Sequence, residues 1–190
     1  EHTSPNPGLF QEETFRKGFA QLAPLNVSFD AWFYHPQMPE LTDLAQAFPE
    51  TPIVMDHVGA PLGIGPYKGL RDEIFSQWSA NVTALAKCSN VYVKLGGLAM
   101  KLTGFGHHKL DVPPSSEVLA GDWKPYLMHC IEAFGPERCM FESNFPVDKA
   151  SCAYTTLWNA FKRLTADFSA SDKAALFHDT ATRFYRIEEA

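Results

Sequence analysis

The chain has 190 residues, of which 45% are hydrophobic and 13% aromatic, enough to bury the core of one globular domain. It carries 16 basic against 22 acidic residues, a net charge of −6, and no cluster of Lys or Arg, which excludes nucleic acid as an expected partner. No apolar run approaches the roughly 18 residues of a membrane span. The four cysteines lack metal-site spacing, so a reduced, cytoplasmic protein without a membrane partner is expected.

Segments with helical periodicity alternate with short apolar runs of strand length. Helices are predicted within 12–25 and over 39–48, 71–88, 124–134, 153–165 and 171–186, and strands over 27–34, 53–57, 91–96 and 139–144. This alternation predicts a parallel sheet with helices packed on it, an α/β fold. No repeat or linker interrupts the pattern, so residues 1–190 are expected to form a single domain.

The loops that follow strands are long, whereas those that precede them are short. Residues 59–70 follow the second predicted strand and residues 98–122 the third. Long loops at the end where strands finish form the catalytic face of an α/β barrel. A closed barrel needs eight strands and about 250 residues. The chain is therefore expected to supply half of one.

Alternation along each strand sorts side chains into a helix-facing set and an interior set. It places Asp30, His57, Lys94, Glu142 and Asn144 in one interior. A charge there is costly unless it is paired, so Lys94 is expected to pair with Asp30 or Glu142. An ion-pair network that only fixes geometry is the alternative to a functional site.

His57 is predicted to share the interior face with Met55, at the end of the second strand. Its imidazole can ligate a metal, relay protons or donate to an oxyanion, although a core histidine that only makes hydrogen bonds is the alternative. Asp30 on the first strand, and Trp32, Tyr34 and His35 at its end, are candidates for substrate binding. For His35, a surface position before proline is the alternative.

Three segments, VMDHVGAP, VYVKLGGL and CMFESNFPVDK, together with FDAWFYHPQMPELTDLAQAFPE, carry a resemblance. The chain resembles the amidohydrolase-related (amidohydrolase 2) family of TIM-barrel metal-dependent hydrolases, on the branch of fuconolactonase-like and pyrone-dicarboxylate-lactonase-like enzymes. The resemblance spans essentially the whole chain. It implies the C-terminal half of a (β/α)8 barrel, strands five to eight, with the N-terminal half missing. A start in a polar loop without Met suits a chain that begins inside a gene.

The resemblance also implies site residues. In this family an HxH pair on the first strand and the His of a DHxG motif contact metal or substrate, and an Asp in an SDWP-type motif acts as base or ligand. His57 matches the DHxG histidine, which implies a metal ligand and one divalent ion such as Zn in the complete protein. No HxH pair occurs in the chain, and Asn144 stands where the motif has Asp. An amide cannot accept a proton from water, so Glu142 or Asp148 would have to restore the charge, unless Asp148 caps the next helix.

The implied activity is that of a lactonase-type hydrolase acting on a lactone or another small cyclic ester or amide of a carboxylate or sugar acid. Water would attack the carbonyl, His57 would bind a metal or polarise the oxygen, and Lys94 would hold a substrate anion or stabilise developing charge. Glu142 or Asp148 would act as base. The alternatives are non-oxidative decarboxylation of an aromatic acid on the same scaffold, and a noncatalytic degenerate barrel that binds a small acid.

Half a barrel leaves open sheet edges and an unfilled interior. The isolated chain is therefore expected to be inactive, and to form a homodimer or aggregate through those edges. In addition, His57 and Asn144 are expected to open into the largest pocket, beneath the loops 59–70 and 98–122.

Overall fold

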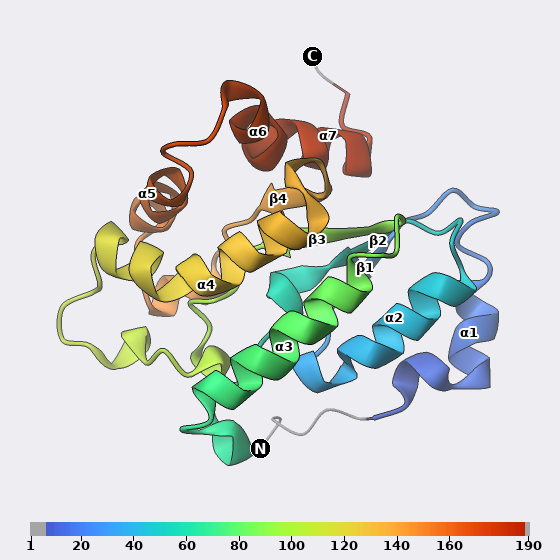
Figure 1. Ribbon diagram of the computed structural model, residues 1–190, viewed down its shortest axis with the longest axis horizontal. Coiled ribbons are helices and arrows are strands. Elements are labelled where there is room, and N and C mark those ends of the chain that lie inside the picture. The colour runs from blue at the N-terminus through green and yellow to red at the C-terminus, as the bar shows by residue number, and fades with distance from the viewer. Residues whose placement is uncertain (1–6, 189–190) are drawn as a thin grey trace.

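The computed structural model describes residues 7–188 as a parallel sheet with helices packed against one face (Figure 1). Four strands lie in the order β1 (Phe29–Ala31), β2 (Ile53–Met55), β3 (Val91–Leu95) and β4 (Cys139–Phe141), and each pairs with the next in parallel. Consecutive parallel strands with a helix in each connection are the repeating unit of an α/β barrel. The predicted fold class is confirmed as part of such a barrel.

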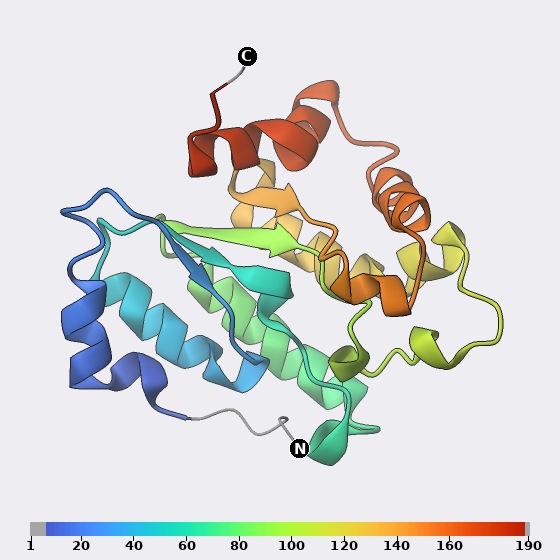
Figure 2. The same ribbon diagram turned by 180° about the vertical axis from the view of Figure 1, so that it is seen from behind.

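Helices precede, connect and follow the strands. They are α1 (Glu13–Phe19), α2 (Met38–Ala47), α3 (Arg71–Leu85), α4 (Ser116–Phe134), α5 (Tyr154–Leu164), α6 (Ala170–Ala174) and α7 (Thr180–Tyr185). Figure 1 shows α2, α3 and α4 in front of the sheet, and Figure 2 shows the strands from the opposite side, where these helices lie behind them. We call this opposite side the concave face. None of the helices within residues 7–188 has the length and apolar character needed to cross a membrane.

The main core lies between the sheet and the helices. Its largest fully buried side chains include Trp78, Trp123, Phe161, Met38 and Leu41, and the four cysteines are free and buried. A smaller apolar cluster joins Val54, Met140 and Phe184, with Tyr92 packed against it. Because Val54 pairs with Tyr92 in the sheet, this cluster marks the concave face, and α7 reaches it through Phe184.

The strands are shorter than predicted. β2 ends at Met55 because His57 and Val58 adopt left-handed backbone conformations, with φ of 55° and 49°. β4 ends at Phe141, and Asn144 also has a positive φ, of 50°. The polar residues that we assigned to strand ends therefore lie in the turns just after the strands, where a left-handed residue redirects the chain.

Two helices also differ from prediction. α4 begins at Ser116, eight residues before the expected start at 124, because the Ser115 hydroxyl accepts a hydrogen bond from the Val118 amide at 3.4 Å and caps the helix. The loop after β3 is correspondingly shorter. The expected helix over 171–186 is α6 and α7 joined by a π-helical turn, Ala175–Asp179.

Candidate active site

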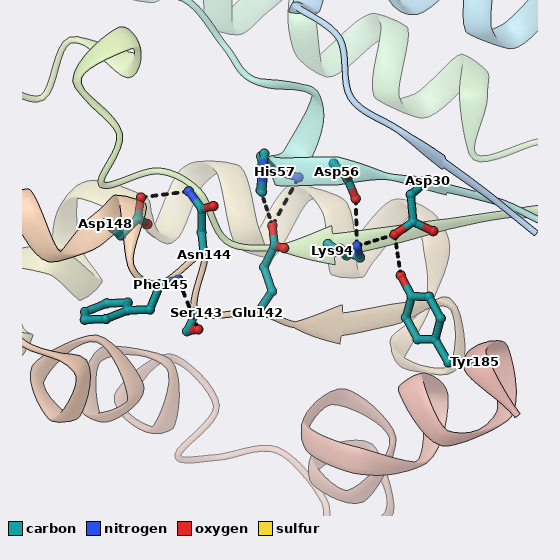
Figure 3. Close-up of polar contacts among 10 residues, drawn as sticks. All are labelled: Asp30, Asp56, His57, Lys94, Glu142, Ser143, Asn144, Phe145, Asp148 and Tyr185. Carbon is teal, nitrogen blue, oxygen red and sulfur yellow. Dashed lines mark hydrogen bonds and ion pairs between the residues drawn. The ribbon is translucent and has the colours of Figure 1, made fainter. Parts of the chain in front are cut away.

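The Lys94 ammonium forms the centre of an ion-pair cluster on the concave face (Figure 3). Its Nζ lies 2.6 Å from Asp30 Oδ2 and 2.9 Å from Asp56 Oδ1, and the Tyr185 hydroxyl donates to Asp30 Oδ2 at 2.8 Å. The predicted Lys94–Asp30 pair is confirmed. Burial by itself lowers the pKa of Lys94, but hydrogen bonds to these three neighbours outweigh burial and raise it, so the ammonium stays charged.

Asp56 belongs to this cluster, and sequence reasoning missed it. Asp30 pairs with Val54 across the sheet, so alternation along β2 directs Asp56 to the concave face and Met55 to the helices. The prediction that Met55 and His57 share the interior face is therefore wrong. Burial raises the pKa of Asp56, and the hydrogen bond and charge of Lys94 oppose that rise.

His57 and Glu142 form a second polar pair beside this cluster. Glu142 Oε1 lies 2.5 Å from His57 Nδ1 and also accepts a hydrogen bond from the His57 amide at 3.2 Å. Burial lowers the pKa of His57, but the hydrogen bond and charge of Glu142 outweigh it and raise the pKa. Because the carboxylate occupies Nδ1, Nε2 is the ring nitrogen left to exchange a proton with a bound molecule.

Two glycines after β3 make room for this pair. A Cβ built on Gly97, whose φ is +71°, would lie 2.5 Å from His57 Cβ, and one built on Gly96 would lie 2.4 Å from Glu142 Cγ. Both distances are far below van der Waals contact. The Gly-Gly sequence therefore permits the close approach of His57 and Glu142.

We predict that Gly97→Ala separates His57 from Glu142 and destabilises the fold by about 2 kcal/mol, because the new methyl group overlaps the His57 side chain and the left-handed backbone becomes strained. Thermal unfolding measures the loss, and the NMR titration of His57 reports the lost partner as a lowered pKa. Gly18→Ala in α1 is the control, since a Cβ there meets nothing within 4 Å. A Gly97→Ala protein with unchanged stability and His57 titration would contradict the proposed close fit.

Asn144 and Asp148 form a third pair in the turn after β4. Asn144 Nδ2 donates to Asp148 Oδ1 at 2.8 Å, and Asp148 is completely buried. Burial raises the pKa of Asp148 to about 7, although the Asn144 hydrogen bond and the charge of His57 act in the opposite direction. The suggestion that Asp148 caps the next helix is wrong, because Ala153 is the residue at the start of α5.

This pKa predicts a pH dependence of stability. The carboxyl group has a pKa of about 7 in the folded chain against 3.8 as its ordinary value, so the folded state holds the proton more tightly. The stability that protonated Asp148 contributes is complete below its ordinary pKa and is lost as the pH rises toward 7. In the wild-type chain, this loss lowers the free energy of unfolding by up to about 1.4 kcal/mol per pH unit between these two pKa values. Asp148→Asn cannot titrate, so we expect the variant to lack this slope. Urea unfolding between these pH values measures it, with Asp167→Asn as an exposed control; equal pH profiles would contradict the prediction.

The three candidates at the end of β1 separate in the structure. The Trp32 ring lies 6.0 Å from the His57 ring and 5.1 Å from that of Tyr34, and Trp32 is 47% exposed, so this pair borders the concave face beside His57. His35 does not join them. It is 1% exposed, its Nδ1 accepts a hydrogen bond from the Leu62 amide at 3.1 Å, and burial lowers its pKa to about 4. The alternative of a surface position is therefore wrong, and His35 supports the loop after β2; its contact with substrate stays a prediction.

We expected His57 and Asn144 to line a pocket beneath the loops after β2 and β3, and the pocket found between these loops has other walls. The pocket between the loops after β2 and β3 is lined by residues such as Leu62, Gly63 and Thr103, and by neither His57 nor Asn144. Within residues 7–188, no three His, Cys, Asp or Glu side chains meet as a group that could hold a metal ion. These residues therefore do not by themselves fit a divalent metal, and the predicted ligand role of His57 stays a prediction.

The family model described as Amidohydrolase matches residues 2–187. The chain belongs to this family. It is 38% identical over 181 residues to y4mH of Sinorhizobium fredii, an uncharacterized protein, covering 95% of this chain and 54% of that one. It is 26% identical over 177 residues to an L-fucono-1,5-lactonase of Burkholderia multivorans, covering 92% and 56%. The chain thus spans about half the length of these curated relatives.

The same fold occurs in a crystal structure of an amidohydrolase from Burkholderia multivorans with bound Zn. The TM-score is 0.82 at 24% sequence identity, and the match covers 95% of this chain and 60% of that one. These matches confirm the predicted family and its lactonase branch, together with the α/β barrel architecture.

Proposed function

We propose that the chain, as one amidohydrolase domain, forms strands five to eight of a barrel that hydrolyses a lactone or another small cyclic ester of a carboxylate or sugar acid. The observation that carries this proposal is the His57–Glu142 pair, with Glu142 Oε1 at 2.5 Å from His57 Nδ1. A carboxylate that orients an imidazole and leaves its other nitrogen open is a recurrent arrangement for proton transfer.

Hydrolysis of a lactone requires water to add to the carbonyl carbon and a proton to reach the departing ring oxygen. His57 Nε2 is the candidate for this proton transfer, and Glu142 stabilises the imidazolium that forms. Lys94 is balanced by Asp30 and Asp56, so we assign it to the floor of the site rather than to direct capture of a substrate anion. The rings of Trp32 and Tyr34 supply an apolar wall beside His57.

The lactone class rests on the name of the Burkholderia multivorans lactonase and on its match to this chain. One observation favours a second candidate, a noncatalytic protein that binds a small acid. Asn144 offers no carboxylate, and its amide is engaged by the buried Asp148. A homodimer through the open sheet edges, at β1 and β4, and a small-molecule partner also remain proposals.

The test is product analysis with the complete protein that contains this chain. Five- and six-membered sugar lactones and aromatic carboxylic acids are incubated with it, and the products are separated by chromatography. A ring-opened acid supports the lactonase, whereas released CO₂ from an aromatic acid would replace it with a decarboxylase. Saturable binding of the acids without turnover of any lactone would establish the noncatalytic alternative.

A further inference from the structure

A second concave site lies outside the His57 cluster, between the loop after β2, the loop after β3 and the start of α3. Its walls combine apolar side chains, two tyrosines and two cations: Pro61, Leu62, Ile74, Tyr67, Tyr126, Lys68 and Arg71, with Thr103 and glycine backbone completing them. Among the described residues 7–188, no carboxylate lines this pocket. Its charged side chains are therefore both positive.

The Arg71 guanidinium is half-buried in this pocket and has no ion-pair partner among residues 7–188. It lies 4.1 Å from the centre of the Phe105 ring and donates to the Tyr126 hydroxyl and the Thr103 carbonyl, both at 3.3 Å. These two hydrogen bonds to neutral groups use part of a fork that has five N–H donors. A partly buried cation usually pairs with a carboxylate. Because Arg71 lacks such a partner among residues 7–188, its guanidinium can pair with an anion from outside the chain.

The pocket is held in shape by close backbone packing of its two loops. The Gly63 amide donates to the Leu102 carbonyl at 2.8 Å, and a Cβ on Gly63 would lie 2.3 Å from the Thr103 carbonyl oxygen. A Cβ on Gly104 would meet the Gly63 carbonyl oxygen at the same 2.3 Å. Glycine at both positions lets the loops touch, so the pocket exists before any ligand arrives.

We propose that this pocket binds a small organic carboxylate, at a site separate from the His57 cluster. The planar guanidinium fork matches a carboxylate bidentately. The apolar side chains and tyrosine rings of the pocket suit the hydrophobic body of such an acid, which inorganic phosphate lacks. The pocket's position, independent of His57 and Glu142, makes this inference independent of the proposed hydrolysis.

The test uses the full chain with benzoate as probe, by isothermal titration calorimetry and by amide chemical shifts in NMR. We expect saturable binding of benzoate, with shifts at Gly63, Gly69 and Gly104. Arg71→Gln is expected to weaken binding at least tenfold, and Arg71→Lys, which keeps the charge but loses the fork, by an intermediate factor. Arg163→Gln, the same change at an exposed arginine on α5, is expected to leave affinity within twofold.

Several results would overturn the proposal. The proposal fails if benzoate shows no saturable binding. It also fails if the amide chemical-shift changes are confined to residues around His57, because benzoate would then bind in the other site. Equal weakening by Arg71→Gln and Arg163→Gln would reduce the effect to overall charge. Inorganic phosphate binding as tightly as benzoate would refute the choice of an organic carboxylate. Because the shift map uses the unmodified chain, it decides the location even if Arg71→Gln does not fold.

Discussion

Replacing His57 with Asn in the complete protein is expected to lower kcat/KM for its lactone substrate by about 1,000-fold, the usual scale of a lost general acid–base group. Asn suits this position because it tolerates the left-handed backbone, φ 55°, that His57 adopts. The variant therefore tests the imidazole rather than the turn. Ring-opened product is measured at substrate concentrations well below KM, so that kcat/KM is read directly.

Two companion variants sharpen this result. Glu142→Gln keeps a hydrogen-bond acceptor but removes the charge, so we expect a smaller loss of about 100-fold and a lowered pKa of His57 in an NMR titration. His108→Gln in the loop after β3 is the histidine control, and we expect it to leave kcat/KM unchanged. If His57→Asn keeps more than a tenth of the activity, the pair is structural and the proposed chemistry is wrong.

Lys94→Met is expected to destabilise the chain by about 3 kcal/mol, because it leaves two carboxylates facing each other without their shared cation. The Lys94 side chain is 18% exposed and that of Asp56 11%, so solvent screens this loss little, whereas Asp30 at 40% is screened more. Urea unfolding at neutral pH measures the change in free energy of unfolding.

The control for Lys94→Met is Lys17→Met, which breaks the exposed Lys17–Glu13 pair on α1 and is expected to cost only a few tenths of a kcal/mol. Adding Asp30→Asn and Asp56→Asn to Lys94→Met removes the stranded charges, so most of the lost stability is expected to return. If the triple variant is as unstable as Lys94→Met alone, packing of the lysine chain, not its charge, holds the cluster together.

Periodicity and alternation determined much of this protein before any tertiary contact was known. Strand-length apolar runs alternate with helical segments along the chain, and this order predicts consecutive parallel strands. Two neighbouring parallel strands need a crossover connection, and the helix between them supplies it. Alternation along β1 and β3 placed Asp30 and Lys94 on the same side, and the cost of burying single charges required them to pair, as they do at 2.6 Å. The family motifs around His57 were equally readable.

Alternation carries this information only while the backbone is extended. At His57 and Asn144 the positive φ turns the chain, so side-chain directions after β2 and β4 could not be read from parity. Pairing of Asp30 with Val54, which brings Asp56 toward Lys94, is a property of sheet register. No sequence signal fixed that register here.

Contacts between distant segments were decided by tertiary structure alone. The Tyr185 hydroxyl reaches Asp30 across 155 positions of sequence because α7 packs Phe184 onto the concave face. Arg71 lies in its pocket because two glycine-bearing loops touch. Local patterns determine which elements form and which face of each is apolar. Where separate elements meet depends on packing and loop geometry summed over the whole chain, which is why these contacts appear only in the folded structure.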